Sequence, residues 1–209
     1  MFRLDDINSK FSENTGSVFK NKGSRVLLYI HGFGSCGSGQ KVDVLRQCFG
    51  DDEVLSPDLP ICPLDAMTIL ENLIDEHPVD LMLGSSLGGY YAEWLNGCHK
   101  IPSVLINPAV KPYELLTEFI GTNQHWCTGE PFELTSEHVE NLKQYSRREP
   151  GPDEHYLVLL HSDDEVLDYR VAAERYRDFN VVIEQGGNHR FENLDHYLAE
   201  IEAFRNANQ

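Results

Sequence analysis

The sequence predicts an α/β protein built on a doubly wound, mainly parallel sheet of about six strands. Three observations support this fold class. Short, continuously apolar stretches recur along the chain, and stretches with helical spacing separate them. Residue types that carry chemistry stand directly after several apolar stretches, where the carboxyl ends of parallel strands meet. One of these residues is a serine between two glycines, in a motif that joins a strand to a helix.

Length and composition set the broad class. The 209 residues suit one domain with a substantial core, and the hydrophobic content of 41% is typical of a soluble globular protein. Thirty-four acidic and 17 basic residues give a formal net charge of −17. Such a surface repels phosphates, so neither nucleic acid nor an anionic membrane is expected as a partner. The oligomeric state is not indicated by the sequence.

The cysteines, the first residues and the lengths of the apolar stretches indicate the cellular compartment of the protein. The five cysteines form no Cys-X-X-Cys pair and no cluster with histidines, so no metal site is expected. The first residues lack the basic and apolar run of a signal peptide. No apolar stretch approaches the roughly 18 residues of a membrane span. We therefore expect a protein of the reducing cytoplasm.

The first half of the chain begins with a polar stretch over residues 1–24, which we interpret as an extension ahead of an α/β domain over 25–209. The first strand is expected over 25–30, because this run is continuously apolar. Pro63 and Pro78 mark the start and the end of a helix. The elements predicted in this half are strands over 25–30, 53–56 and 79–82 and helices over 40–49, 63–77 and 88–96.

In the second half, the alternation of strand and helix is interrupted over residues 111–154. Within this interruption we expect a helix over 135–145 with Ser136 as its N-cap, and a lid-like insertion over 111–150. The final helix is expected from Phe191, which shares an apolar face with Leu194. The other elements predicted here are strands over 103–106, 156–160 and 181–183 and a helix over 170–177.

The motif Gly84-Ser85-Ser86-Leu87-Gly88 has the Gly-X-Ser-X-Gly pattern of the nucleophile elbow of α/β-hydrolases. A serine hydroxyl attacks a carbonyl only if it projects from the backbone, so the strand must turn sharply into the helix. That turn strains the serine and brings the strand and the helix close together, which requires small residues such as Gly84 and Gly88. Ser86 is the predicted nucleophile.

A base and an acid are expected after later strands, in the order serine, acid, histidine. His189 lies in a glycine-rich loop after the last predicted strand and is the predicted base. A buried carboxylate must accept the N–H of its ring. Three carboxylates follow the preceding strand, and we choose Asp164, with Asp163 second and Asp168 third.

An oxyanion hole needs two N–H donors near the serine. In this fold one comes from the residue after the nucleophile, here Leu87, and one from the loop after the first buried strand, where Phe33 is the predicted donor. His31, in the same turn, is assigned a structural hydrogen-bonding role. No metal or organic cofactor is needed for this chemistry.

These stretches together resemble a known family, the YqiA/YcfP-type small bacterial esterases (uncharacterised protein family UPF0227). The matching stretches are 28–33, 84–90, 164–169 and 186–189. The resemblance implies an esterase-like α/β-hydrolase fold and triad, with Asp164 aligned to the acid of the family. The chain departs from the family pattern in its polar extension and at Ser162-Asp163, where members tend to have Thr-Gly, so Asp163 remains an alternative acid.

The predicted function is a serine esterase that hydrolyses carboxylic esters through an acyl-enzyme. A thioesterase acting on acyl-CoA or another thioester would use the same groups, and a non-catalytic binding protein with the hydrolase fold is a second alternative. The insertion over 111–150 is expected to cover the serine and to line an acyl pocket, because it carries several large aromatic residues. We predict Trp126 and Phe119 as substrate-binding residues; packing onto the core is the competing role for these aromatics.

Overall fold

Six parallel strands form the central sheet of the computed structural model, which describes residues 25–208. Their order across the sheet is β2-β1-β3-β4-β7-β8, and every neighbouring pair is parallel. The predicted fold class is thus confirmed, and each predicted strand is present. The strands are β1 (Val26–Ile30), β2 (Val54–Leu55), β3 (Val79–Ser85), β4 (Ser103–Ile106), β7 (Tyr156–His161) and β8 (Asn180–Glu184). The predicted extension over 1–24 lies outside the described residues.

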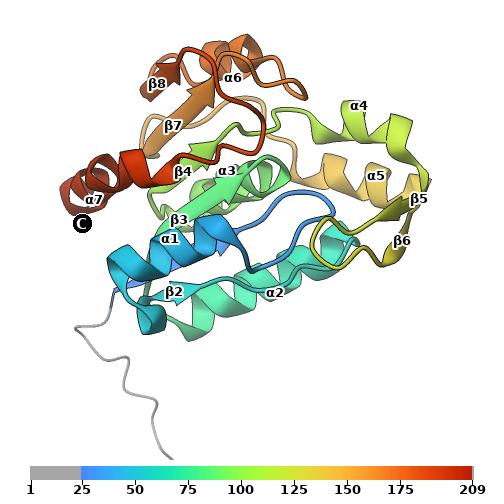
Figure 1. Ribbon diagram of the computed structural model, residues 1–209, viewed down its shortest axis with the longest axis horizontal. Coiled ribbons are helices and arrows are strands. Elements are labelled where there is room, and N and C mark those ends of the chain that lie inside the picture. Colours follow the sequence, from blue (N-terminus) through green and yellow to red (C-terminus); the bar gives the residue numbers. More distant parts are fainter. Residues whose placement is uncertain (1–24, 209) are drawn as a thin grey trace, which may run out of the picture.

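Helices cover both faces of the sheet (Figure 1). Alternate residues of a strand point to opposite faces, so a strand buried on both sides needs apolar residues throughout. In β1, Leu28 and Ile30 pack in one layer of the core, and Leu27 and Tyr29 pack in the other. The first layer includes α2 (Pro63–Glu76), α3 (Leu87–His99) and α6 (Tyr169–Arg175), and the second includes α1 (Gln40–Phe49) and α7 (Leu198–Ala207).

The start of the last helix differs from the prediction. The chain forms a 3₁₀ turn over Leu194–Tyr197 and only then α7, so Phe191 precedes the helix. Phe191 has a φ of 50° and donates its N–H to Asn188 Oδ1 at 3.1 Å. Its ring is nevertheless fully buried. Phe191 is therefore a buried residue of a tight turn, and its spacing to Leu194 does not reflect a helix that begins at Phe191.

The segment between β4 and β7 contains a small second sheet beside the carboxyl edge of the main one (Figure 1). Strands β5 (Gly121–Gln124) and β6 (Pro131–Leu134) pair antiparallel, and we call residues 121–134 the hairpin. The flanking elements are α4 (Pro112–Leu116) and α5 (Ser136–Leu142), each followed by a 3₁₀ turn, Thr117–Phe119 and Lys143–Tyr145. The cap of α5 is Thr135 rather than Ser136, because the Thr135 side chain accepts the His138 N–H at 3.1 Å.

Buried ion pairs attach the end of this segment to the core. Arg147 donates from both terminal nitrogens to Glu154, at 2.6 Å each, and also to the Glu93 carbonyl at 3.1 Å. Arg175 on α6 pairs with the Glu93 carboxylate, whose side chain is only 4% exposed. Tyr156 donates to Glu154 at 2.7 Å, so the buried carboxylate has several partners.

Within residues 25–208, no helix combines the length and the apolar character that crossing a membrane would require.

Candidate active site

The turn between β3 and α3 places Ser86 at the carboxyl edge of the sheet. Ser86 has a φ of 54° and a ψ of −118°, an uncommon conformation for a residue with a side chain. A Cβ at Gly84 would lie 2.4 Å from the Gly88 carbonyl oxygen, and one at Gly88 would lie 2.0 Å from the Ile30 carbonyl oxygen. Only glycine fits at these two positions. The predicted strain and close packing of the elbow are therefore present.

Ser86, His189 and Asp164 form a continuous hydrogen-bonded chain. Ser86 Oγ lies 3.1 Å from His189 Nε2, and His189 Nδ1 lies 2.8 Å and 3.0 Å from the two oxygens of Asp164. An ionised carboxylate only accepts, so Nδ1 carries the proton and Nε2 is left to accept from the serine. The histidine side chain is 19% exposed and that of Asp164 is 2% exposed. The loops after β3, β7 and β8 supply the three residues.

Of the three carboxylates considered from the sequence, Asp164 is the one that reaches His189. The N–H groups of Val166 and Leu167 each donate to Asp164 Oδ1 at 2.8 Å, which fixes the carboxylate against the loop. Asp163 accepts instead from Ser162 Oγ at 3.0 Å. Asp168 caps α6 by accepting the Arg170 N–H at 3.0 Å. The orientation of the imidazole is thus set by Asp164.

Asn107 binds the backbone at and before His189, a role that was not predicted from the sequence. It directly follows β4, is 2% exposed and has a φ of 40°. Its Nδ2 donates to the carbonyls of Asn188 and His189, at 3.1 Å and 3.3 Å, and its Oδ1 accepts the His161 N–H at 2.9 Å. Its position directly after a buried strand was the signal available in the sequence.

Two further residues hold the loop that carries the histidine. The buried His161 ring stacks on Phe191 with centroids 3.9 Å apart, and its Nδ1 lies within hydrogen-bond distance of the Asn188 backbone, 3.0 Å from the carbonyl oxygen and 3.1 Å from the nitrogen. Glu165 accepts the backbone N–H of His189 at 3.0 Å. That hydrogen bond lowers the pKa of Glu165 from its ordinary value. Neither residue was singled out from the sequence.

Residues 31–39, which we call the β1 loop, lie against the serine. A Cβ at Gly32 would come within 3.2 Å of Ser86 Cβ. His31 Nε2 accepts the Leu59 N–H at 2.9 Å, so its Nδ1 carries the proton and donates to the Gly32 carbonyl at 2.9 Å. Burial lowers the pKa of His31, which keeps this ring neutral. The structural role expected for His31 is borne out by these bonds.

The two predicted oxyanion donors both line a narrow hollow next to the serine. Leu87 is the first residue of α3, where N–H groups have no partner within the helix. The Phe33 N–H has no hydrogen-bond partner within residues 25–208. The hollow is lined by His31, Gly32, Phe33, Gly34, Leu59, Pro60, Ile61, Leu87 and Tyr91.

The two residues predicted to bind substrate lie near this hollow but do not line it. Phe119 is 45% exposed, and its ring lies 6.5 Å from that of Phe33, edge to face. Trp126 is 85% exposed and sits at the turn of the hairpin. Contact of either side chain with a substrate stays a prediction.

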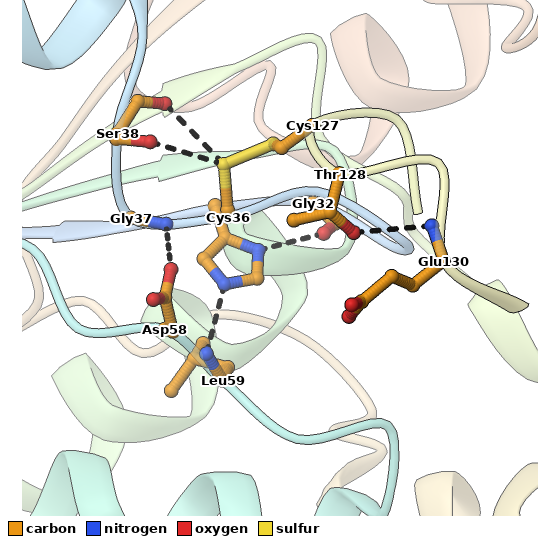
Figure 2. Close-up of a disulfide and its surroundings, with 10 residues drawn as sticks. Gly32, Cys36, Gly37, Ser38, Asp58, Leu59, Cys127, Thr128 and Glu130 are labelled. Atoms are coloured by element: carbon orange, nitrogen blue, oxygen red, sulfur yellow. Dashed lines mark hydrogen bonds between the residues drawn. A yellow bond between two sulfur atoms is a disulfide. The ribbon is translucent and has the colours of Figure 1, made fainter. Parts of the chain in front are cut away.

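A disulfide between Cys36 and Cys127 joins the β1 loop to the hairpin (Figure 2). The two cysteines are 91 positions apart, so no local spacing revealed the pair. The adjacent Trp126 N–H donates to the Gly34 carbonyl at 2.8 Å. The sequence reasoning, which found no paired spacing and expected a reducing compartment, did not anticipate this bond; Cys48, Cys62 and Cys98 are free.

Comparison with protein families gives a match that covers most of the chain. The family model described as "Uncharacterised protein family (UPF0227)" matches residues 26–206. A UPF0227 protein of Citrobacter koseri is 27% identical over 190 residues, which cover 86% of this chain and 98% of the relative.

Solved structures with a similar fold are α/β-hydrolases. Est1E from Butyrivibrio proteoclasticus, solved with ferulic acid bound, has a TM-score of 0.66 at 15% identity, covering 90% of this chain and 92% of its own. Mouse α/β hydrolase domain-containing protein 10 has a TM-score of 0.66 at 17% identity, with the same coverage of both chains. At such low identity these similarities establish the fold and leave the activity open.

Proposed function

The chain belongs to the uncharacterised protein family UPF0227, and we propose that it is a serine hydrolase that cleaves carboxylic esters through an acyl-enzyme. The match to the family model confirms the resemblance to UPF0227 that was found in the sequence. One observation carries the proposal, namely the continuous hydrogen-bonded chain from Ser86 through His189 to Asp164. A binding protein that had lost catalysis would have no need to keep all three residues in this geometry.

In the first half of the reaction, Ser86 Oγ attacks the acyl carbonyl and His189 Nε2 takes its proton. Asp164 stabilises the imidazolium that forms and keeps the ring in one tautomer. His189 then returns the proton to the leaving alcohol, and the acyl group remains on the serine. A water molecule repeats these steps in the second half and releases the acid.

The charge on the carbonyl oxygen develops next to the Phe33 and Leu87 N–H groups, which we propose as its hydrogen-bond donors. Leu87 contributes additionally through the positive end of the dipole of α3, a helix of 13 residues. Loss of one donor of this kind typically costs about 3–4 kcal/mol of transition-state stabilisation.

The charges of the insertion over 111–150 favour an ester with a neutral alcohol over a coenzyme A thioester. Residues 111–150 carry seven acidic and four basic residues. Three of the four basic residues, Lys111, Lys143 and Arg147, already pair with carboxylates. The phosphates of coenzyme A need free cationic partners. The narrow, mostly apolar hollow beside Ser86 further favours a short acyl group.

Substrate profiling and active-site labelling test the proposal. A fluorophosphonate probe should label Ser86, and hydrolysis of p-nitrophenyl esters should be fastest for short acyl chains, with acyl-CoA compared under the same conditions. Ser86→Ala should abolish labelling and hydrolysis. The neighbouring Ser85→Ala is the matched control and should keep both. A wild-type protein that neither reacts with the probe nor hydrolyses any ester of the series would refute the proposal.

A further inference from the structure

We propose that the Cys36–Cys127 disulfide holds the β1 loop in its catalytic conformation, so that the rate of ester hydrolysis depends on the oxidation state of this pair. The inference rests on the proposed function, because it concerns the position of the Phe33 N–H. Neither cysteine belongs to the core: Cys36 lies in the β1 loop, whose residues 31–34 line the hollow, and Cys127 lies in the hairpin. In this proposal they are positioning residues that act on the reaction through Phe33.

The two ends of the β1 loop are fixed by contacts with the segment after β2. At the first end, His31 links the Gly32 carbonyl to the Leu59 N–H. At the other end, the Gly37 N–H donates to Asp58 Oδ1 at 2.7 Å, and a Cβ at Gly37 would lie 2.2 Å from the Ser56 carbonyl oxygen. Both ends therefore keep their place without the hairpin.

The middle of the loop, by contrast, is held by the hairpin. The Trp126 N–H binds the Gly34 carbonyl, and the next residue, Cys127, is bonded to Cys36. The Phe33 ring lies edge to face on the Phe132 ring of β6, with centroids 5.4 Å apart. Trp126 and Cys127 of the hairpin thus hold the loop at Gly34 and Cys36, just after the proposed oxyanion donor Phe33.

The hairpin itself has little to hold it in place. It is a two-stranded sheet in which most residues are exposed or half-buried, and such a ribbon is only marginally stable alone. The disulfide supplies a covalent link across 91 positions of chain. Without it, one backbone hydrogen bond and ring contacts remain between the hairpin turn and the middle of the loop. The covalent bond is therefore the strongest constraint on this contact.

A dithiol reductant can reach the bond, because Cys127 is exposed and Cys36 is half-buried. Thiol–disulfide exchange breaks the S–S bond, transfers two electrons and two protons to give two thiols, and leaves the reductant as its own disulfide. The freed loop then samples positions in which the Phe33 N–H no longer faces the developing oxyanion. Substrate binding changes little, because that hydrogen bond forms mainly in the transition state.

The experiment compares kcat and KM for a short p-nitrophenyl ester before and after treatment with dithiothreitol, normalised by fluorophosphonate titration of active sites. Complete removal of a donor costs about 10²–10³-fold in kcat, so loosening the loop should cost about tenfold, with KM changed less than about twofold. The Cys36→Ser, Cys127→Ser double variant should show the lower kcat and no response to the reductant. The Cys48→Ser, Cys62→Ser, Cys98→Ser triple variant should respond as the wild type does.

The outcomes separate the two proposals. Equal kcat in the oxidised and reduced proteins, or a double variant as fast as the oxidised wild type, would overturn the inference and leave the esterase proposal intact. Absence of activity in every state would reject the esterase proposal itself. A boronic acid, which forms a tetrahedral adduct on the serine, gives an independent measurement: its affinity should fall on reduction by about the same factor as kcat.

Discussion

Asp164 has four hydrogen bonds in this structure, two from backbone N–H groups and two with the imidazole. Asp164→Asn would keep the size of the side chain but place an amide opposite Nδ1, which favours the wrong tautomer of His189. By analogy with the aspartate of serine proteases, kcat should fall by about 10⁴-fold while the protein stays folded. Steady-state kinetics on the p-nitrophenyl ester series measures this directly.

The matched controls are Asp163→Asn and Asp168→Asn, which change exposed carboxylates that do not contact the histidine. Both should stay within a few fold of the wild-type kcat. If Asp163→Asn proved more harmful than Asp164→Asn, the acid would be assigned to the neighbouring residue.

Asn107 offers a second test at the level of single residues. Asn107→Gly keeps the positive φ without strain and removes three hydrogen bonds, including both to the carbonyls before and at His189. A displacement of about 1 Å in a catalytic group can cost about 10²-fold, so kcat should fall by between about 10- and 100-fold. The measurement is kcat per labelled active site, together with its pH profile.

The control for Asn107 is Asn96→Ala, which removes another buried asparagine that donates to a backbone carbonyl, that of His155, away from the site. It should lower the free energy of unfolding and leave kcat unchanged. An Asn107→Gly variant with a lower melting temperature but normal kcat would show that Asn107 stabilises the fold without positioning the base.

Single residues were predictable from the sequence where their position depends only on the end of one strand. Ser86, Asp164 and His189 each follow an apolar stretch, so the carboxyl-edge rule found them. Cys36 and Cys127 were not found, because their contact depends on how a whole insertion folds back. Asn107 also directly follows a buried strand, but it was missed because the expected triad and oxyanion hole have no place for an asparagine and its hydrogen bonds go to the backbone of a distant loop.

At the scale of elements, the hairpin and its neighbours make a testable prediction about substrate binding. The chain has two tryptophans, and they differ in environment: Trp94 packs against Tyr145 at 5.5 Å between centroids, whereas Trp126 is exposed. A long-chain phosphonate bound to Ser86 should cover Trp126 and shift its fluorescence to the blue. Trp126→Phe should remove most of this shift, as recorded in an emission spectrum before and after inhibition.

Trp94→Phe serves as the control and should keep the shift. If the shift persisted in Trp126→Phe and vanished in Trp94→Phe, the acyl chain would lie over another part of the protein. The prediction that Trp126 binds substrate would then be wrong, and its 85% exposure also argues against packing onto the core.

The elements of the main sheet were predictable because their signals are local and strong. Strands buried on both faces are continuously apolar, and prolines bracket α2. The hairpin was not foreseen: β5 has the sequence Gly-Thr-Asn-Gln, which has neither apolar alternation nor β-branched enrichment. Its contacts with the β1 loop join residues far apart in the sequence, so no local pattern reports them.

At the scale of the whole molecule, the buried carboxylate of Glu154 predicts how the stability of the protein depends on pH. Burial alone would raise the pKa of Glu154, but hydrogen bonds from Arg147 and Tyr156 outweigh it and lower the pKa to about 2. Because the pKa is lower in the folded state, this group stabilises the protein above its ordinary pKa. That contribution is lost as the pH falls from about 4.5 to about 2.

Glu154→Gln tests this linkage. Breaking the buried pair with Arg147 should lower the free energy of unfolding at pH 7 by about 3 kcal/mol. The difference from the wild type should shrink as the pH is lowered below 4.5, as measured by urea denaturation at several pH values. The adjacent Asp153→Asn, which removes an exposed partner of Lys100, should have a much smaller effect. A Glu154→Gln difference independent of pH would contradict the assignment.

Ser86, Asp164 and His189 follow three separate strands, and this arrangement has a consequence for the synthesis of the protein. The hydrogen bond from Ser86 to His189 joins positions 103 residues apart, and β8, which leads to the histidine, is the edge strand that pairs after all the others in the chain have been made. At a translation rate of about 5–20 residues per second, the nucleophile leaves the ribosome roughly 5–20 s before its base. Under the proposed mechanism, a nascent chain that has not yet reached His189 carries the nucleophile without its base. Messages truncated anywhere before the codon for His189 should therefore yield catalytically silent fragments.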